Sequence, residues 1–523
     1  MTSAPVKNRS GSAVSPASAG VPAGVGEPVA LTLRGHDLLF PALPYRMRER
    51  VEAATRDAQL QQFVNHATYV KDELRKEVFG RTFGDRYESL RQLAGRIKQH
   101  TLDHLDYYLE RFIDNAQAAG AIVHFAVDSR EANDICLSIA KRINARLCVK
   151  SKSMVTEETH LVPELEAIGC ETVETDLGEF IIQLDHDAPS HIVTPMIHKD
   201  RTAVGRAFTR ELGAPYTEDA ETLTQIARVH LRNRYRRADL GISGANFLVA
   251  DSGSLVICTN EGNGRLCTSV PRVHVAFVGI EKVVPDFRSL AVMLKLLARS
   301  STGQPITVYN HIMTGPRRSN EPDGPQEMHI VLIDNGRSAV LDARTREMLR
   351  CIRCGACLNA CPVYRKVGGH SYGAVYSGPI GAILTPMLKG LANYADLPNA
   401  SSLCGACYAA CPVKIDIPKY LVQHRATMVQ QGIMPWQEWL MYRLWALSLR
   451  HPASYRLGGW MQKTMFRMRA RTAGTLSRGD AYTARGWLSS GVGGWTQERD
   501  MPTPPARSFR QWWRERGKTA DEH

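Results

Sequence analysis

The chain has 523 residues, a formal net charge of +13 and an apolar content of 44%. That length exceeds what one hydrophobic core normally holds, so we expect two or three domains. The apolar content is typical of a globular protein and excludes a chain that is mainly disordered or built of membrane spans. No stretch of 18 residues is both uncharged and predominantly apolar, so we expect no segment that crosses a bilayer.

Residues 1 to about 30 are rich in Ala, Gly, Ser, Pro and Val. This segment lacks the apolar core of a signal peptide and a twin arginine, and its composition predicts a disordered tail over residues 1–30. A cytoplasmic location is therefore the default expectation. It is also the compartment in which cysteines stay reduced and available for metal binding.

An α/β domain is predicted over residues 31–345. Its first part, from Met47 to about Ala119, has the three- and four-residue apolar spacing of helices. Short apolar runs then alternate with helical segments, and Asp128 or Ser129 is placed to cap the first of these helices. This βα rhythm predicts a mixed, largely parallel sheet. The predicted strands are Ile122–Ala126, Leu147–Val149, Phe180–Leu184, Phe247–Ala250, Leu255–Cys258, His274–Val278 and His329–Ile333.

Several loops of this domain are more polar than packing requires. Lys150-Ser-Lys-Ser-Met154 follows a strand, which is where ligand-facing loops lie in an open α/β sheet. Asn260-Glu-Gly-Asn-Gly-Arg265 fits either an anion cradle with an arginine to pair or a hairpin turn, since Asn-Gly is a strong hairpin signal. His191 is expected to be a hydrogen-bonded structural group, the usual role of an isolated histidine. The chain contains no Gly-rich dinucleotide fingerprint and no P-loop.

Seven of the twelve cysteines form two closely spaced runs. They are Cys351-Ile-Arg-Cys354-Gly-Ala-Cys357-Leu-Asn-Ala-Cys361-Pro362 and Cys404-Gly-Ala-Cys407-Tyr-Ala-Ala-Cys411-Pro412. The first run has the C-x2-C-x2-C-x3-C-P spacing of two-cluster bacterial ferredoxins, in which the fourth cysteine ligates the other cluster. This crossed scheme predicts two iron–sulfur clusters in a ferredoxin-type domain over residues 346–430. The first cluster takes Cys351, Cys354, Cys357 and Cys411, and the second takes Cys361, Cys404 and Cys407.

The second cluster is one thiolate short. Ser401 stands three residues before Cys404, where the eighth ligand is expected. The serine oxygen, a water or small molecule, and a three-iron cluster each account for the gap, and the spacing does not choose among them. Zinc is disfavoured because seven thiols in two such runs do not divide into tetrahedral sites. The cysteines outside the runs are expected to be buried free thiols: Cys136, Cys148, Cys170, Cys258 and Cys267.

Stretches outside the cysteine runs resemble a known family. Gly241–Val256, Glu261–Arg265 and His274–Pro285 resemble the lactate-utilisation domain, while Gly368–Gly373 and Tyr376–Gly381 resemble the LutB family of iron–sulfur subunits. The resemblance covers nearly the whole chain from about residue 40. It implies an electron-carrying subunit of a three-component complex that oxidises L-lactate to pyruvate. It also implies a first domain similar in fold to sugar-phosphate isomerases and CoA-transferases. Members of the family carry seven cluster cysteines, so Ser401 is no departure from it.

The C-terminal segment, residues 431–523, is basic and rich in tryptophan. It holds all eight tryptophans, and its fifteen Lys and Arg outnumber its seven Asp and Glu. One helix with a single apolar face is predicted from the spacing of Trp436, Trp439, Leu440, Leu444 and Leu447. We expect the segment to dock the other subunits of the complex, since aromatic residues and Arg are enriched at protein interfaces. Peripheral contact with a membrane surface is the alternative, and no motif indicates specific nucleic-acid binding.

Two functions are compatible with these features. In the first, the chain is a non-catalytic electron carrier with two [4Fe-4S]-type clusters and no catalytic residue of its own. In the second, the α/β domain itself acts on a hydroxy acid, thioester or sugar phosphate through the loops around Lys152, Glu261 and Arg265. The missing flavin and nicotinamide fingerprints count against the second, because oxidation of lactate needs an acceptor for two electrons. The terminal electron acceptor and the subunit stoichiometry have no signature in the sequence.

Overall fold

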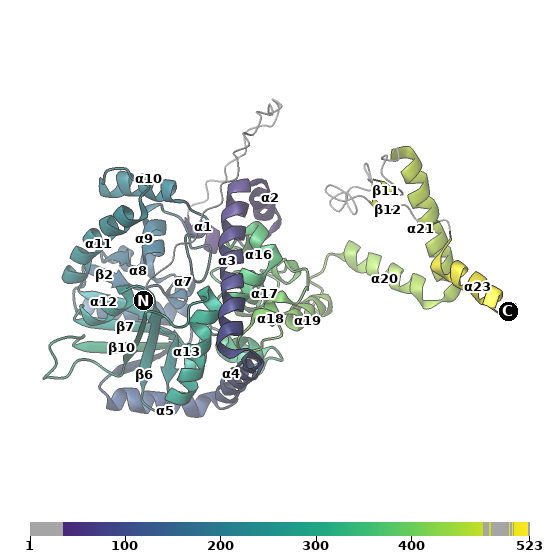
Figure 1. Cartoon of the computed structure of the whole chain (residues 1–523). Helices are drawn as coiled ribbons and strands as arrows, with labels where there is room; N and C mark the ends of the chain where they lie inside the picture. The colour runs from purple at the N-terminus through teal and green to yellow at the C-terminus, as the bar shows by residue number, and fades with distance from the viewer. Residues whose placement is uncertain (1–34, 474–480, 483–500, 503–504, 506, 521–523) are drawn as a thin grey trace, which may run out of the picture. The chain divides into compact units, whose positions relative to one another are not determined.

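The structure, a computed structural model, describes residues 35–473, 481–482, 501–502, 505 and 507–520. The chain divides into two compact units, Met1–Leu421 and Val422–His523. The first unit contains the main sheets and the cysteine runs, and the second is mainly helical (Figure 1).

Helices form the N-terminal part of the first unit, as the apolar spacing predicts. Asp57 caps the long helix α3 by accepting a hydrogen bond from the backbone N–H of Leu60 at 2.8 Å. The helices are α1 (Gly35–Leu39), α2 (Arg48–Arg56), α3 (Ala58–Phe83), α4 (Arg86–Asp103) and α5 (Leu105–Ala118).

A six-stranded sheet, parallel throughout, lies at the centre of the α/β domain. Its order is β1-β10-β7-β4-β2-β3. The strands are β1 (Ile122–Ala126), β2 (Leu147–Lys150), β3 (Glu171–Glu174), β4 (Leu240–Gly244), β7 (Val273–Gly279) and β10 (Glu327–Ile333). A parallel sheet puts the carboxyl ends of its strands at one edge, so the loops after β2, β3, β4 and β7 open at the same edge.

A second sheet, mostly antiparallel, contains four further strands. We predicted one mixed sheet, and the structure separates the parallel strands from the antiparallel ones. The order is β8-β5-β6-β9, with β8 (Val283–Val284), β5 (Phe247–Val249), β6 (Ser254–Thr259) and β9 (Tyr309–Met313). Only the β5–β8 pair in this sheet is parallel.

Helices and the second sheet cover the two faces of the parallel sheet. Alternate residues of β10 point to opposite faces: Val331 and Ile333 pack with α6–α8, whereas Ile330 and Leu332 pack with α5 and the second sheet. Asp128 caps α6, as predicted. The remaining helices of this domain are α6 (Ser129–Arg142), α7 (Met154–Thr159), α8 (Leu161–Ala167), α9 (Leu177–Leu184), α10 (Arg201–Leu212), α11 (Ala220–Arg237), α12 (Asn263–Ser269), η1 (Ile280–Lys282), α13 (Phe287–Thr302) and α14 (Arg337–Asp342).

Two local predictions in this domain are wrong. Phe180–Leu184, predicted as a strand, is the second half of helix α9, which begins after the cap residue Asp176. Asn260–Arg265 is not a hairpin, because it leads from β6 into α12. It is not the predicted anion cradle with an arginine either, because the Arg265 side chain points to solvent.

The cysteine runs form turns and short helices that share one hydrophobic core with the α/β domain. Helix α3 packs against α13 of that domain and also against α15 and α16. The core that contains Cys354, Cys357 and Cys411 therefore also contains Val64 of α3 and Leu296 of α13. The elements are η2 (Arg346–Arg350), α15 (Ala356–Ala360), α16 (Pro362–Val367), η3 (His370–Tyr372), α17 (Gly378–Lys389), η4 (Leu397–Asn399), α18 (Ala406–Ala410) and α19 (Ile417–Gln430), which runs into the second unit.

The second unit contains the basic, Trp-rich segment. Its elements are α20 (Trp436–Arg450), α21 (Pro452–Ala473), α23 (Phe509–Ala520) and the strand pair β11 (Ala481–Tyr482) and β12 (Met501–Pro502). The predicted helix is α20, but its apolar residues are not confined to one face, since Met441 and Trp445 are exposed on other sides. Trp487 and Trp495 lie outside the described residues. Among the helices that the structure describes, none has the length and apolar content needed to cross a membrane.

Candidate metal centre

The two cysteine runs fold into matching turns. Gly355 and Gly405 have positive φ angles of 76° and 82° and directly precede the five-residue helices α15 and α18. The residues two before them, Arg353 and Leu403, are also left-handed, with φ angles of 58° and 55°. Consecutive turns of this kind curl the backbone so that its N–H groups converge, which suits an anionic sulfur group. Helices α15 and α18 pack against each other, so the two turns are neighbours.

Four thiols from both runs line one small cavity. Its other walls are mainly apolar, with Ile192, Ile380 and Ile417 among them. Backbone N–H groups point at two of the sulfurs, from Arg353 to Cys351 Sγ and from Ile415 to Cys411 Sγ, both at 3.4 Å. The four thiols are those predicted for the first cluster: Cys351, Cys354, Cys357 and Cys411.

The chemistry of these thiols fits a cluster. Burial raises the pKa of Cys354 far above that of a free thiol, and the neighbouring Cys351 and Cys411 raise it further. Such a group stays protonated unless a metal replaces the proton. Four thiols around an apolar cavity therefore suit an iron–sulfur cluster, which binds thiolates and spreads their charge.

Three further thiols form a second group beside the first. Burial and the neighbouring Cys361 raise the pKa of Cys407 to about 12. Cys404 also raises the pKa values of Cys361 and Cys407, which makes the three close neighbours. Cys407 in turn raises the pKa of Cys357 in the first group. The structure thus brings together both predicted sets, with Cys361 and Cys411 crossing between the runs, although their roles as ligands stay predictions.

The two groups differ in exposure. Cys404 is exposed, whereas every thiol of the first group is at least partly buried. Ser401, the position of the missing ligand, is partly buried on the loop before Cys404. Its hydroxyl oxygen accepts a hydrogen bond from the backbone N–H of Leu403 at 3.1 Å. The geometry does not choose among the three alternatives for the open position, which stay predictions.

A buried network of charges surrounds the first group. The Arg353 guanidinium lies over the Tyr376 ring at 4.5 Å and 3.4 Å from a carboxylate oxygen of Glu281. Glu281 also pairs with Arg337 at 2.7 Å, and Arg337 pairs with Glu158 at 2.8 Å. Arg353 is the cation of this network that acts on Cys351. A positive charge beside an iron–sulfur cluster would favour its reduced form, so Arg353 would raise the potential of a cluster held by the first group. No pattern in the sequence indicates this network, except that Arg353 stands inside the first Cys-x2-Cys.

A larger cavity of about 460 Å³ lies beside the first group. The predicted ligand-facing loop lines it with Ser151, Lys152 and Ser153. Glu261 lines it as well and accepts a hydrogen bond from the backbone N–H of Leu177 at 3.1 Å. Burial, with a smaller contribution from Asp176, raises the pKa of Glu261 to about 7. Two of the three residues named for the alternative function, Lys152 and Glu261, therefore meet at one cavity, and Arg265 does not.

His191 is a structural group, as predicted. Its Nδ1 accepts a hydrogen bond from the backbone N–H of Val193 at 3.0 Å, and its Nε2 lies 3.1 Å from Asn359 Oδ1. Burial lowers the pKa of His191 well below its usual value, so the ring is neutral. It ties the loop after α9 to helix α15.

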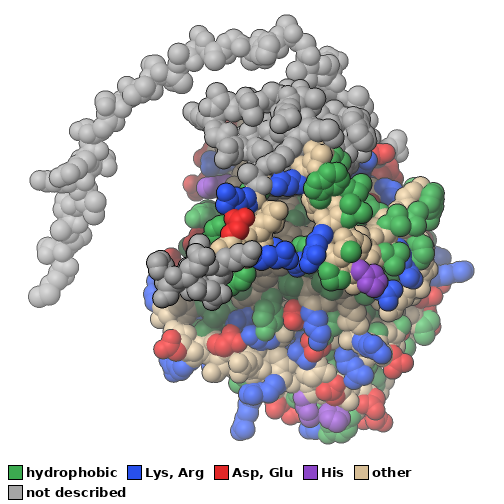
Figure 2. Space-filling view, turned by 90° about the vertical axis from the view of Figure 1, so that its right-hand side faces the viewer, with side chains coloured by type: hydrophobic (Ala, Val, Ile, Leu, Met, Phe, Trp, Pro, Cys, Tyr) green, Lys and Arg blue, Asp and Glu red, His purple; other side chains and the backbone are tan. Residues whose placement is uncertain are grey.

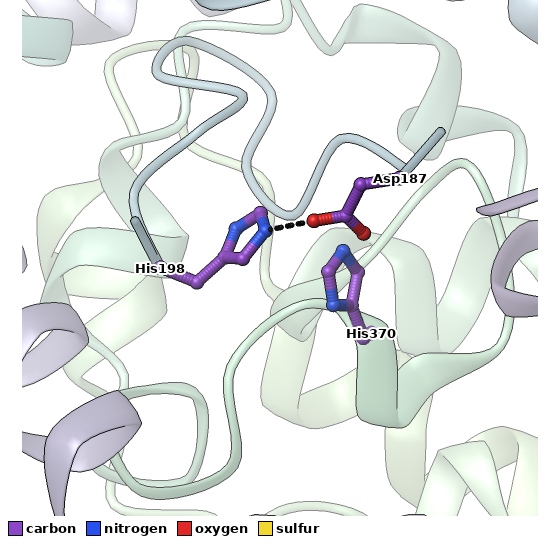
Figure 3. A group of neighbouring side chains, drawn as sticks. All are labelled: Asp187, His198 and His370. Carbon is purple, nitrogen blue, oxygen red and sulfur yellow. Dashed lines mark hydrogen bonds and ion pairs between the residues drawn. The ribbon is translucent and has the colours of Figure 1, made fainter. Parts of the chain in front are cut away.

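Another pair of histidines lies beside Asp187 with ligand-like spacing (Figure 3). His198 Nε2 is 2.8 Å from Asp187 Oδ2, and the ring of His370 lies against that of His198. The Lys199 ammonium, however, is 2.7 Å from the same carboxylate oxygen. A bound cation at this place would meet that ammonium, so we describe the group as an ion-pair network. A cluster of three glutamates elsewhere likewise has a lysine at its centre, Lys150, which is 2.7 Å from Glu174.

Three families match successive parts of the chain. Residues 109–333 match the LUD domain, residues 347–415 the 4Fe-4S dicluster domain, and residues 422–518 the C-terminal domain of lactate utilisation protein B. The dicluster match agrees with the cysteine geometry and supports an iron–sulfur cofactor. The relatives of the whole chain include lactate utilization protein B from Geobacillus thermodenitrificans, which is 45% identical over 437 residues, or 83% of this chain and 89% of the relative.

Other relatives and one solved structure are similar too. Lactate utilization protein B from Bacillus licheniformis is 44% identical over 439 residues, which cover 83% of this chain and 90% of the relative. A DUF162 family protein of known structure from Deinococcus radiodurans is 12% identical and covers 44% of this chain and 98% of its own, with a TM-score of 0.26. That score is too low to support any comparison of the two structures.

Proposed function

Because the chain belongs to the lactate utilization protein B family, we propose that it carries electrons in the oxidation of L-lactate to pyruvate. The observation that supports this role is the pair of neighbouring thiol groups, each drawn from both cysteine runs. We assign Cys351, Cys354, Cys357 and Cys411 to a first [4Fe-4S] cluster, and Cys361, Cys404 and Cys407 to a second. Bound clusters of this kind supply reversible one-electron transfer.

Lactate oxidation releases two electrons and two protons, and two neighbouring one-electron sites match that number. The chain's own residues hold the sites at different exposures, with the first group buried in the shared core and Cys404 at the surface. We propose that electrons leave or enter through the exposed second group. The protons are released with pyruvate at a partner subunit, which holds the acceptor for the electron pair.

The C-terminal unit is proposed as the docking surface for those partners, in the cytoplasm. No residue of α20 is buried, and Trp436 and Trp445 are 68% and 60% exposed. A helix that is apolar on several sides is normally covered, and the basic residues Arg443 and Arg450 favour an acidic protein surface. Figure 2 shows hydrophobic side chains next to Lys and Arg side chains on one face of the molecule. Peripheral contact with lipid is the alternative.

Reconstitution tests the carrier role directly. The purified chain, with its clusters assembled under anaerobic conditions, is mixed with L-lactate with and without the other subunits of the complex. We expect the clusters to be reduced only when the partners are present. Reduction of a dye by the chain and lactate alone would contradict the carrier role and support the second candidate, in which the α/β domain is catalytic. The observation that favours this candidate is the 460 Å³ cavity lined by Lys152 and Glu261.

A further inference from the structure

The 460 Å³ cavity has the position of a ligand site in an α/β fold. Segments that follow β2, β3, β4 and β7 all contribute to its wall, through Lys152, Asp176, Ala245 and Lys282. The carboxyl ends of parallel strands are where open α/β sheets bind ligands. The volume also lies in the range of small-molecule sites.

One end of the cavity carries two cations without a full set of partners. Lys282 is only 7% exposed, and the opposite charge that acts on it most strongly is that of Glu281, which already pairs with Arg337 and Arg353. Arg353 Nη1 is buried and lacks a hydrogen-bond partner. A buried charged donor without an acceptor costs free energy. We therefore expect a ligand group that accepts hydrogen bonds to lie in the cavity beside these two cations.

The acidic residues Glu261 and Asp176 lie in a different part of the cavity from Lys282. The charged groups that act on Lys282 include Glu281, Arg353 and Cys351, whereas those that act on Glu261 are Asp176 and Lys152. The cavity therefore has a cationic pole, at which Lys282 and Arg353 outnumber Glu281, and an acidic pole, at which Glu261 and Asp176 outnumber Lys152. Apolar side chains, including Leu177 and Leu297, line the wall as well.

We infer that this cavity binds a small hydroxy- or oxo-carboxylate, with its carboxylate at Lys282 and Arg353 and its oxygen-bearing end toward Glu261. A carboxylate supplies acceptors for both cations, and an ammonium with a guanidinium is a suitable receptor for it. The acidic pole disfavours a ligand with negative charge at both ends, which counts against diphosphates and dicarboxylates.

The bound carboxylate would lie beside the first cluster. Arg353 and Cys354 line both this cavity and the cavity of the first thiol group. A ligand at Lys282 and Arg353 would change the charge next to that cluster, and the signal of the cluster would report its binding. The inference deepens the proposed role in lactate oxidation and rests on it only for the choice of L-lactate and pyruvate as probes.

Calorimetry on the cluster-loaded full chain tests the inference, with L-lactate, pyruvate and the uncharged analogue L-lactamide as titrants. We expect one saturable site for L-lactate or pyruvate and affinity for L-lactamide that is lower by about tenfold to a hundredfold, the usual effect of losing a charged hydrogen bond. Lys282→Met should cause a similar loss. The control Lys295→Met removes an exposed lysine from α13 and should leave the affinity unchanged.

Three results would overturn the inference. The first is that neither acid binds saturably to protein with its full iron content. The second is that L-lactamide binds as tightly as L-lactate. The third is that the Lys282→Met and Lys295→Met variants bind the acid with the same affinity. Each would mean that the two cations only balance the charge of the cluster. If Lys282→Met fails to assemble its clusters, the comparison of L-lactate with L-lactamide on the unaltered protein decides. Binding needs no electron transfer, so a chain that binds the acid but is never reduced would refute the carrier role and leave this site standing.

Discussion

The seven cysteines that we assign to the clusters have unequal surroundings. Cys354 is buried in the shared core beside Arg353, and Cys404 is exposed. A cluster in the first group would therefore be the less exposed of the two and would have the charge of Arg353 beside it. A cluster in the second group is open to solvent and has one thiolate fewer. Potential and stability depend on exposure and ligand type, so the two sites should behave differently.

Changing Cys354 to Ala tests the first group. The variant should lose up to about four irons per chain, the content of one cube, and retain an oxygen-labile remnant at most. Iron analysis under anaerobic conditions measures this loss. The matched control is Cys136→Ala, which removes a buried thiol of α6 from outside both cysteine runs and should leave the iron content unchanged. Equal iron loss in both variants would show that thiol burial, not ligation, decides.

Changing Ser401 to Ala tests the open position of the second cluster. If the hydroxyl oxygen is a ligand, the paramagnetic signal or potential of the second cluster shifts while the first cluster stays as it was. An unchanged spectrum assigns the position to water, another side chain or a three-iron form. Ser402→Ala, one residue further along the exposed loop, serves as the control and should change neither signal.

The grouping of the seven thiols was predictable because cluster ligation would fix their spacing along the chain. The charged residues around the thiols could not be predicted from the sequence. Lys282 lies in the η1 turn and Arg353 in a cysteine loop, and only the fold brings them to one cavity. A lysine inside an apolar stretch such as Ile280–Val284 usually indicates a strand end with a solvated side chain. Its burial depends on packing from elements distant in sequence.

At the level of elements, a buried polar network joins the α/β domain to the cysteine region. Arg337 of α14 pairs with Glu158 of α7, which also accepts a hydrogen bond from the Tyr376 hydroxyl at 2.5 Å. Arg337 and Glu158 are 1% and 2% exposed at their side chains. Removing one member leaves an uncompensated buried charge, the costly case for such a pair.

Arg337→Met should therefore lower the free energy of unfolding by about 3–5 kcal/mol. Denaturant unfolding followed by circular dichroism measures the change. Arg234→Met is the control, because Arg234 pairs with Glu171 at the surface and exposed pairs contribute at most about 1 kcal/mol. Similar losses of unfolding free energy in the two variants would mean that water reaches the Arg337 network.

The pair between Glu327 of β10 and Arg142 of α6 gives a pH prediction. Arg142 lowers the pKa of Glu327 from 4.5 to about 2. A carboxylate with a lowered pKa stabilises the fold above its ordinary pKa and loses that effect as pH falls through the folded value. The stability difference between the wild type and Glu327→Gln should thus be constant above about pH 4.5 and vanish toward pH 2. The side chain is 36% exposed, so the difference should not exceed about 1 kcal/mol.

Thermal unfolding of both proteins at matched pH values measures that difference, and the acid sensitivity of the clusters is common to both. A difference that grows as the pH falls would contradict the assignment.

Among the elements, β1, β2 and β10 were predictable from short apolar runs between turn signals. Helix α9 was not, because a short, fully apolar run such as Phe180–Leu184 looks alike in a buried helix and a buried strand. The Asp176 cap was the signal that could have distinguished them.

Strand β4 was missed because Gly241-Ile-Ser-Gly244 has the composition of a loop. In the structure the glycine at 241 allows close packing of helix α12, since a Cβ there would lie 1.9 Å from the carbonyl oxygen of Cys267. The backbone is an ordinary central strand, paired with both β2 and β7. Sequence composition cannot separate a loop glycine from one required by a close approach between elements.

At the scale of the whole molecule, the two units have separate proposed roles, with clusters in the first and partner docking in the second. Truncation after Gly432 should leave the iron content unchanged and abolish co-purification with the partner subunits. In the full chain, rising salt should weaken the complex, because basic residues steer it. If the truncated protein contains no iron, the segment is needed for the packing of the cluster domain. If the truncated protein keeps its partners but no longer binds liposomes, the segment is a membrane anchor.

The central claim is that seven cysteines hold two neighbouring clusters. The most direct measurement is metal and sulfide analysis of the anaerobically purified chain, combined with electron paramagnetic resonance after chemical reduction. We expect about seven or eight irons with matching labile sulfide, and two reducible centres whose signals broaden each other because the thiol groups are neighbours. Stoichiometric zinc without labile sulfide, or a single isolated centre with about four irons, would contradict it.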